Sequence, residues 1–74
     1  MKITVLFFAA LKDVAGTSEG EYEVPAGATP EQVADLLLGF HSNVLYAVND
    51  DLAAKDRALT HGDRLALIPP MAGG

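Results

Sequence analysis

The sequence predicts a two-layer α+β domain in which a small mixed sheet packs on one main helix. Segments rich in β-branched and aromatic residues precede and follow a single well-marked helix, which gives the element order β-β-α-β-(β)-β. The helix carries its apolar residues on one side, and such a stripe needs a sheet to cover it. The chain has 74 residues, so it has room for only one core and one domain.

Residues 2–9 predict the first strand because β-branched and aromatic side chains dominate them. Ile3, Val5 and Phe7 fall on one face of this strand, which we expect to join the core. The opposite face is apolar too, so we expect another segment or a partner to cover it. Residues 21–25 alternate polar and apolar side chains after a glycine-containing turn and predict a second strand; a short helical turn fits the long connection.

The start of the helix is the clearest local signal in the chain. Thr29 suits the N-cap, Pro30 suits the first helical position, and Gln32 completes a capping box. Gly39 stands where a glycine commonly ends a helix. Four apolar residues at helical spacing are expected to lie on the sheet: Val33, Leu36, Leu37 and Phe40.

The second half of the chain predicts the remaining strands. Residues 44–48 form a third strand that ends at a polar turn, Leu52 begins a short fourth strand, and residues 64–68 form the last. If the first and last strands are neighbours, their outward apolar side chains make one patch on the face away from the helix. Such a patch usually marks a protein interface. Its members are Leu6, Phe8 and Ile68.

Composition argues against several classes of function. The chain has no cysteine, which excludes thiol catalysis, zinc–thiolate sites and iron–sulfur clusters. Its net charge of -5 and its lack of a basic stripe argue against nucleic acid and favour basic protein partners. The apolar start is too short for a membrane span and lacks a cleavage pattern, so we expect a cytoplasmic protein that does not bind membranes.

The usual catalytic residues do not form a convincing set. His41 and His61 are the two histidines, and we expect both in exposed loops without a metal or acid–base role. Glu31 and Asp35 lie one helical turn apart and are expected on a solvated helix face. There is no glycine-rich phosphate loop before a helix. We therefore expect no metal site, no bound cofactor and no self-contained active site.

The end of the chain has a different character. Two prolines end the last strand, because proline has no N–H to donate to a neighbouring strand. We expect residues 1–69 to form the domain and residues 70–74 to form a flexible tail ending in Gly73 and Gly74. Six extended residues span about 20 Å, and glycine lets a backbone approach other groups closely. Such a tail can enter a narrow channel of a partner and present its carboxylate there, although a tail without function fits the same residues.

Several short segments carry a family resemblance. They are Leu6-Phe7-Phe8-Ala9, Lys12-Asp13-Val14-Ala15-Gly16, Ala47-Val48-Asn49, Gly62-Asp63 and Pro69-Pro70-Met71-Ala72-Gly73-Gly74. In this order they resemble the small subunits of molybdopterin synthase (MoaD type), in the MoaD/ThiS ubiquitin-like family. The resemblance covers essentially the whole chain and implies the β-grasp fold of that family.

The resemblance implies a sulfur carrier. In that family an E1-like activating enzyme uses ATP to adenylate the terminal glycine carboxylate, here Gly74 beside Gly73. The acyl adenylate becomes a thiocarboxylate, which donates sulfur to a pterin precursor in the active site of the large synthase subunit. This chain would then be the non-catalytic, sulfur-donating subunit of a heterotetramer of two small and two large subunits.

Matching positions imply which residues contact partners. The partner-binding set consists of Phe8, Leu52, Ile68, Pro70, Met71 and Ala72. Lys12 stands where the family often has arginine, and it is a further candidate contact. Lysine keeps the charge of arginine but loses its planar, bidentate fork.

Two alternatives stay open. A ThiS-type carrier supplies sulfur for the thiamine thiazole by the same terminal chemistry, although such carriers typically lack the double proline. An interaction module of the same fold would use the sheet face and perform no sulfur chemistry. A ubiquitin-related modifier that is joined to lysines or thiolates tRNA is a weaker third, and one carrier can in principle serve several pathways.

Overall fold

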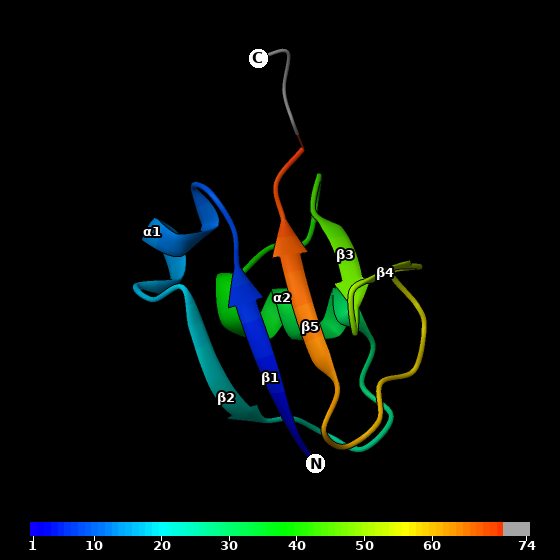
Figure 1. Cartoon of the computed structure of the whole chain (residues 1–74). Coiled ribbons are helices and arrows are strands. Elements are labelled where there is room, and N and C mark those ends of the chain that lie inside the picture. The colour runs from blue at the N-terminus through cyan, green and yellow to red at the C-terminus, as the bar shows by residue number, and fades with distance from the viewer. Residues whose placement is uncertain (71–74) are drawn as a thin grey trace.

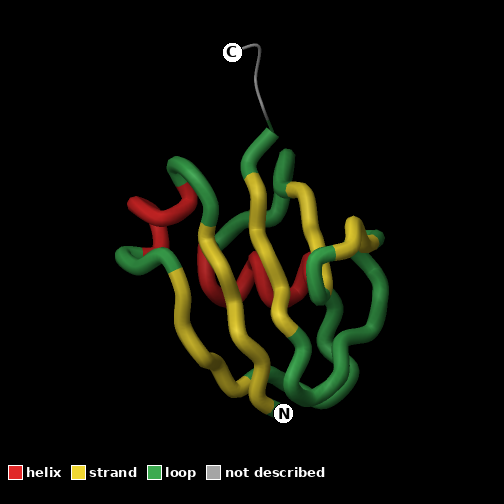
Figure 2. The backbone as a smooth tube through the Cα atoms, viewed as in Figure 1, coloured by secondary structure: helices red, strands yellow, loops and turns green. Residues whose placement is uncertain are grey.

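The computed structural model describes residues 1–70 and shows an α+β domain with the predicted order of elements. The elements are β1 (Lys2–Phe7), α1 (Leu11–Ala15), β2 (Glu19–Glu23), α2 (Pro30–Leu38), β3 (Leu45–Val48), β4 (Asp51–Ala53) and β5 (Arg64–Ile68). The strands form one sheet in the order β2-β1-β5-β3-β4, in which only β1 and β5 are parallel (Figure 1). Helix α2 lies across one face of this sheet (Figure 2).

The core fills the space between α2 and the sheet. Strands β1 and β5 pair in a register that places Val5 beside Leu65 and Phe7 beside Leu67. All four side chains are buried, which confirms the inward face predicted for the first and last strands. The ring of Phe7 also meets that of Tyr22 edge-on, with centroids 6.1 Å apart, and this contact ties β2 to the same core.

Both ends of α2 follow the predicted signals. The Thr29 hydroxyl accepts a hydrogen bond from the Gln32 backbone N–H at 3.3 Å, and the Gln32 side chain accepts one from the Thr29 N–H at 3.0 Å. This capping box pairs two N–H groups that the helix itself cannot pair. Gly39 ends the helix in a left-handed conformation with a φ of 86°, which glycine adopts without steric cost.

The buried face of α2 differs from the predicted one. Leu36 is 63% exposed, whereas Ala34 is fully buried beside Val33. Three consecutive leucines at 36–38 fit more than one helical stripe, and the small Ala34 side chain lets the helix lie close to the sheet. Phe40 is 40% exposed because the helix ends before it. The stripe that packs on the sheet is Pro30, Val33, Ala34, Leu37 and Leu38.

Smaller differences concern the ends of strands. The second strand begins at Glu19 rather than at residue 21, because its pairing with β1 extends to Leu6. The polar turn after β3 is confirmed as a two-residue hairpin loop of Asn49 and Asp50, with φ values of 52° and 74°. Asparagine and aspartate tolerate this left-handed backbone better than most residues, so their side chains suit the tight turn.

Asp63 is a buried carboxylate that joins the start of β5 to its surroundings. One of its oxygens accepts hydrogen bonds from the Asn49 amide at 3.0 Å and the Thr60 hydroxyl at 3.1 Å, and the other accepts one from the Thr60 backbone N–H at 2.9 Å. Burial alone raises the pKa of Asp63, but these hydrogen bonds and the charge of Arg57 outweigh it and lower the pKa below 3.8.

The packing of α2 predicts opposite outcomes for two alanine substitutions. Val33→Ala should lower the free energy of unfolding by about 2–3 kcal/mol, because it removes two buried methyl groups and leaves a cavity. Leu36→Ala should change it by less than about 0.5 kcal/mol, because that side chain is largely in solvent. Urea unfolding of both variants measures the difference, and a large loss for Leu36→Ala would contradict the observed helix face.

The Asp63 network predicts an acid-sensitive part of the stability. Because the folded-state pKa lies below the unfolded value, the charged carboxylate stabilises the fold above about pH 4–5, and this contribution is lost as the pH falls through the folded-state pKa. Asp63→Asn should cost about 1–3 kcal/mol at neutral pH and flatten the decline of stability in acid. Thermal unfolding between neutral and acidic pH tests this, with the exposed Asp56→Asn as control; an unchanged acid decline in Asp63→Asn would refute it.

Candidate functional site

The candidate site is the outer face of the sheet, which we define as the side away from α2. The strand register aligns four apolar side chains in one row across this face, one from each of four strands. They are Leu6, Ala66, Ala47 and Leu52. A second apolar row lies nearer the end of β5, where Leu45 pairs with Ile68. The two alanines in the middle make the first row flat, so a partner can approach the sheet closely.

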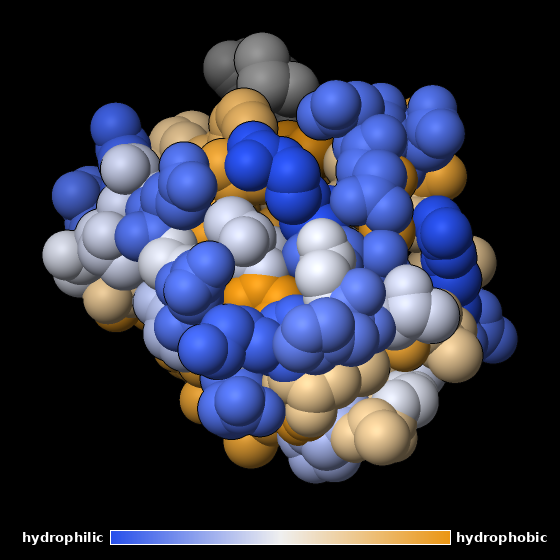
Figure 3. All heavy atoms as spheres, turned by 60° about the horizontal axis from the view of Figure 1, so that its bottom comes forward, coloured by the Kyte–Doolittle hydropathy of each residue, from blue (hydrophilic) through white to orange (hydrophobic). Residues whose placement is uncertain are grey.

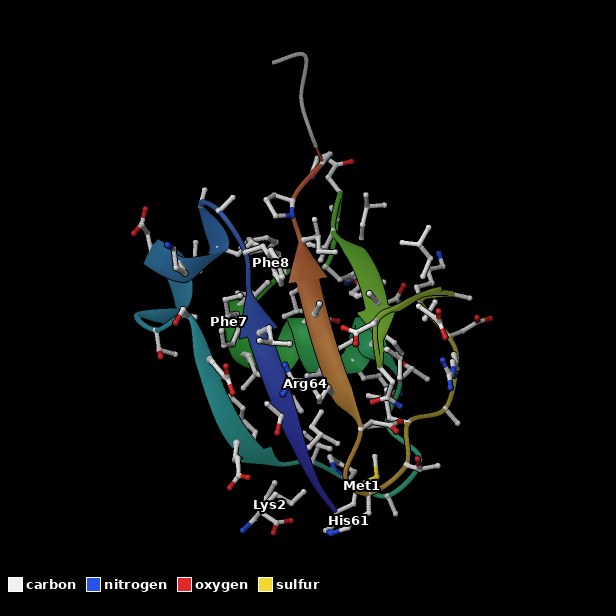
Figure 4. All side chains as sticks on the ribbon, in the orientation of Figure 1. Met1, Lys2, Phe7, Phe8, His61 and Arg64 are labelled. Carbon is white, nitrogen blue, oxygen red and sulfur yellow. The ribbon has the colours of Figure 1, made fainter. Side chains whose placement is uncertain are left out.

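Phe8 extends the second row. Its backbone N–H donates to the Leu67 carbonyl at 3.1 Å, which continues the parallel pairing of β1 and β5 by one residue. The Phe8 ring is 46% exposed, and Figure 4 shows it at the end of the sheet where β5 finishes. The first and last strands are therefore neighbours, and the predicted patch of Leu6, Phe8 and Ile68 exists as one surface.

Polar residues surround this apolar surface. Lys2 and His61 lie at the opposite end of the molecule (Figure 4), where hydrophilic side chains dominate (Figure 3). Arg64 lies nearer the middle of the sheet, where it pairs with Thr4 of β1. Along the β2 edge, Glu19, Glu21 and Glu23 occupy the outward positions and are all exposed. The surface thus has an apolar centre beside an acidic edge, which suits a partner with basic residues around an apolar patch.

The other predicted contact residues occupy different places. Leu52 lies on the edge strand β4 and is 83% exposed, so it ends the first apolar row in solvent. Lys12 projects from α1 and lines a shallow hollow together with Leu6 and Phe8. Pro70 is exposed at the end of the described chain. The remaining predicted contacts and the predicted reactive end, Met71, Ala72, Gly73 and Gly74, lie outside the described residues.

Sequence reasoning missed Leu45, which is 53% exposed beside Ile68. The signal was present, because residues 45 and 47 alternate with the buried Val44, Tyr46 and Val48. Because successive side chains of a strand point to opposite faces, the buried Val44 and Tyr46 place Leu45 on the outer face. Leu45 therefore extends the second apolar row from β5 onto β3.

A second polar cluster lies at the other side of the molecule, around α2. His41 Nδ1 lies 2.7 Å from Asp35 Oδ1, and His41 Nε2 lies 3.8 Å from Glu31 Oε2. The hydrogen bond to Asp35 raises the pKa of His41 above 6.5, the two carboxylate charges add to the effect, and partial desolvation and Lys55 oppose it. The two acids are therefore paired rather than merely solvated.

Residues 1–70 hold no cluster of His, Cys, Asp and Glu side chains suited to a metal ion. The second histidine, His61, accepts a hydrogen bond on Nδ1 from the Lys2 backbone N–H at 3.0 Å, so it fixes the turn before β5. No helix in the same range is long and apolar enough to cross a membrane.

Comparison with known proteins identifies the family. The model described as "ThiS family" matches residues 5–74. The chain belongs to the ThiS family. Within this family, a curated relative from Chlamydomonas reinhardtii named "Molybdopterin synthase sulfur carrier subunit" is 34% identical over an alignment that covers all of both chains. A relative from Arabidopsis thaliana with the same name is 32% identical and covers all of this chain and 84% of its own length.

Solved structures of similar proteins have the same architecture as this ThiS family member. A putative molybdopterin converting factor subunit 1 from Pyrococcus furiosus superposes with a TM-score of 0.80 at 27% identity, covering 96% of this chain and 99% of its own. The small archaeal modifier protein 1 of H. volcanii superposes with a TM-score of 0.79 at 27% identity, covering 95% and 98%. These likenesses confirm the predicted β-grasp fold and the predicted family.

Proposed function

We propose that this chain is the sulfur carrier subunit of a molybdopterin synthase. The observation that carries the proposal is spatial: the apolar outer face is richest at the end of the sheet where β5 finishes and the sequence continues to Gly73-Gly74. A partner that binds this face therefore lies beside Pro70, from which the sequence continues to residues 71–74. The names of the curated relatives support the same assignment.

The proposed chemistry takes place at the Gly74 carboxylate. A carboxylate is a poor electrophile, so an E1-like enzyme first joins it to AMP from ATP and releases pyrophosphate. A sulfur nucleophile at the oxidation level of sulfide then attacks the acyl carbon and expels AMP, which leaves a thiocarboxylate. In the large synthase subunit this group gives its sulfur to a pterin precursor, and water restores the carboxylate.

In this proposal the chain recognises its partners and carries sulfur, while the partners supply the catalytic groups. The large synthase subunit and the activating enzyme bind the outer face, through Phe8, Leu52 and Ile68, and the end of the chain, through residues 70–74. ATP is consumed by the activating enzyme, and the chain binds no cofactor of its own. We place the cycle in the cytoplasm and the carrier in a heterotetramer with two large subunits.

The second candidate function is protein modification. The observation that favours it is the structural likeness to a small archaeal modifier protein. The same activated Gly74 carboxyl would then form an amide with a lysine of a target instead of a thiocarboxylate. A thiamine-pathway carrier uses the identical terminal chemistry, but the relatives from green alga, plant and fly all carry the molybdopterin synthase name.

Intact mass spectrometry tests the proposed chemistry. The full chain is incubated with a cognate activating enzyme, ATP and a sulfur donor, beside a variant lacking Gly73 and Gly74. We expect the mass gain of one oxygen-for-sulfur exchange in the full chain and none in the variant. We expect equal thermal stability, because the last few residues of a domain usually contribute little to its core. An unchanged mass with an enzyme of demonstrated activity would refute the carrier function.

Calorimetric titration with the large synthase subunit tests the docking face. Phe8→Ala and Leu52→Ala should each weaken binding about tenfold or more, because exposed aromatic and apolar anchors dominate interface energies. Their melting temperatures should stay near that of the wild-type chain, since Phe8 is 46% and Leu52 83% exposed and neither belongs to the buried core. Leu36→Ala is the matched control: it removes another exposed leucine, 63% exposed, from α2 on the opposite face, and it should bind like wild type. Unchanged binding of the first two variants would refute the assigned face.

A further inference from the structure

Residues 40–43 form the connection between the end of α2 and the start of β3. Within residues 1–70, no backbone hydrogen bond of good geometry involves this connection. Asn43 has a φ of 60°, a left-handed conformation that asparagine adopts more readily than most residues, and this turns the chain toward β3. The path of the connection therefore depends on side-chain contacts rather than on backbone pairing.

His41 makes the contact that holds this connection to the helix. Its Nδ1 lies 2.7 Å from Asp35 Oδ1, and among the described residues this is the one side-chain hydrogen bond that residues 40–43 make. Its Nε2 lies 3.8 Å from Glu31 Oε2. Glu31 and Asp35 are neighbours one turn apart on α2, so a single imidazole ring faces two successive turns of the helix.

The charged groups around His41 favour its protonated form. From α2, Asp35 and Glu31 both attract a proton to the ring, whereas Lys55, which follows β4 and lies 3.7 Å from Glu31, opposes them. From β3, Tyr46 faces the same two acids, but burial raises the pKa of its phenol further above 10.0. The phenol therefore stays neutral over the range in which a histidine titrates.

Loss of the proton weakens the contact between the connection and the helix. A protonated imidazole donates from both nitrogens and carries a charge that both carboxylates attract. A neutral imidazole has one N–H, so it keeps at most the hydrogen bond to Asp35 and loses its charge attraction to Glu31. The His41 and Asp35 side chains are 44% and 50% exposed, so the proton exchanges with solvent without any opening of the core.

We propose that His41 is a proton-dependent latch that holds residues 40–43 against α2. When the latch is protonated, His41, Ser42 and Asn43 form one wall of a hollow of about 660 Å³ beside the β3–β4 hairpin. When the latch is neutral, residues 40–43 move more freely and this wall loosens. Histidine changes its charge near neutral pH, so the latch responds in the physiological range. The inference concerns the isolated chain and does not depend on the proposed function.

The direction of the pH effect follows from the interactions of the ring. They raise the folded-state pKa of His41 above 6.5, the value expected in the unfolded chain. The latch is therefore fully closed below about pH 6.5, and its hold is lost as the pH rises through the folded-state pKa. Aspartate and glutamate stay ionised above about pH 5, so the imidazole is the group of this cluster that titrates in that window.

The first test follows the isolated full chain by carbon-13 NMR between about pH 5.5 and pH 8.5. Ring shifts report the protonation of His41, and Cα order parameters report the motion of residues 40–43 without loss of signal to amide exchange. We expect order parameters near about 0.85 at the acidic end that fall toward about 0.6 at the basic end. The fall should share its midpoint with the His41 ring. Order that is independent of pH, or that changes at another midpoint, would overturn the proposal.

Asp35→Asn tests the charge of the partner. Asparagine keeps the shape of aspartate and an oxygen acceptor, so the variant removes the negative charge with little change in packing. We expect a lower midpoint for His41, and at pH 5.5 a mobility of residues 40–43 close to that of wild type at pH 8.5. The control Asp13→Asn removes an exposed carboxylate from α1 and should behave like wild type. An unchanged midpoint in Asp35→Asn would contradict the assigned contact.

His41→Ala removes the latch itself. Residues 40–43 should then be mobile at both ends of the pH range, while the order parameters of β1 and β5 stay at their wild-type values. A connection that stays ordered in His41→Ala at either pH would show that another contact holds it, and the latch would be refuted.

Discussion

The parallel pairing of β1 with β5 is the constraint on which the rest of the structure depends. It joins the first and last strands of the chain at the middle of the sheet. Parallel neighbours require a long connection between them, and α2 lies within that connection. Because the buried residues of both strands face the same side, α2 has only one face of the sheet to cover. The same pairing places the end of β5 beside Phe8, and this brings the apolar rows next to the point where the chain continues to its glycine end.

Strand alternation assigns stability and recognition to different side chains. Val5 and Leu65 face α2 and are fully buried, whereas their neighbours Leu6 and Ala66 face outward on the same two strands. The outward side chains contribute little to the core. They can therefore be shaped for contact with a partner without loss of the packing that stabilises the domain. Small residues at positions 47 and 66 keep the outer face flat, which large side chains there would prevent.

The sequence predicted those features that depend on local rules. The capping box at Thr29, the glycine end at Gly39 and the alternation of the first and last strands are set by nearest neighbours along the chain, and all were confirmed. The apolar face of α2 was predicted wrongly because three successive leucines satisfy several stripes, and only the sheet decides between them. The pairing of His41 with Asp35 depends on how the chain after α2 folds back, which no spacing in the sequence encodes. The same holds for the buried Tyr46 hydroxyl, which has no hydrogen-bond partner within residues 1–70.

The charge distribution suits a protein that, in the proposed function, binds each of its protein partners transiently. The net charge is -5, and the outward glutamates of β2 line one edge of the apolar rows. Acidic groups around an interface mainly accelerate association with a basic partner, and their effect is reduced by salt. In the proposed function the apolar rows supply the affinity for the partner. In the proposed cycle one face has to serve an activating enzyme and then a synthase subunit, so rapid association with ready release serves the carrier better than one tight complex.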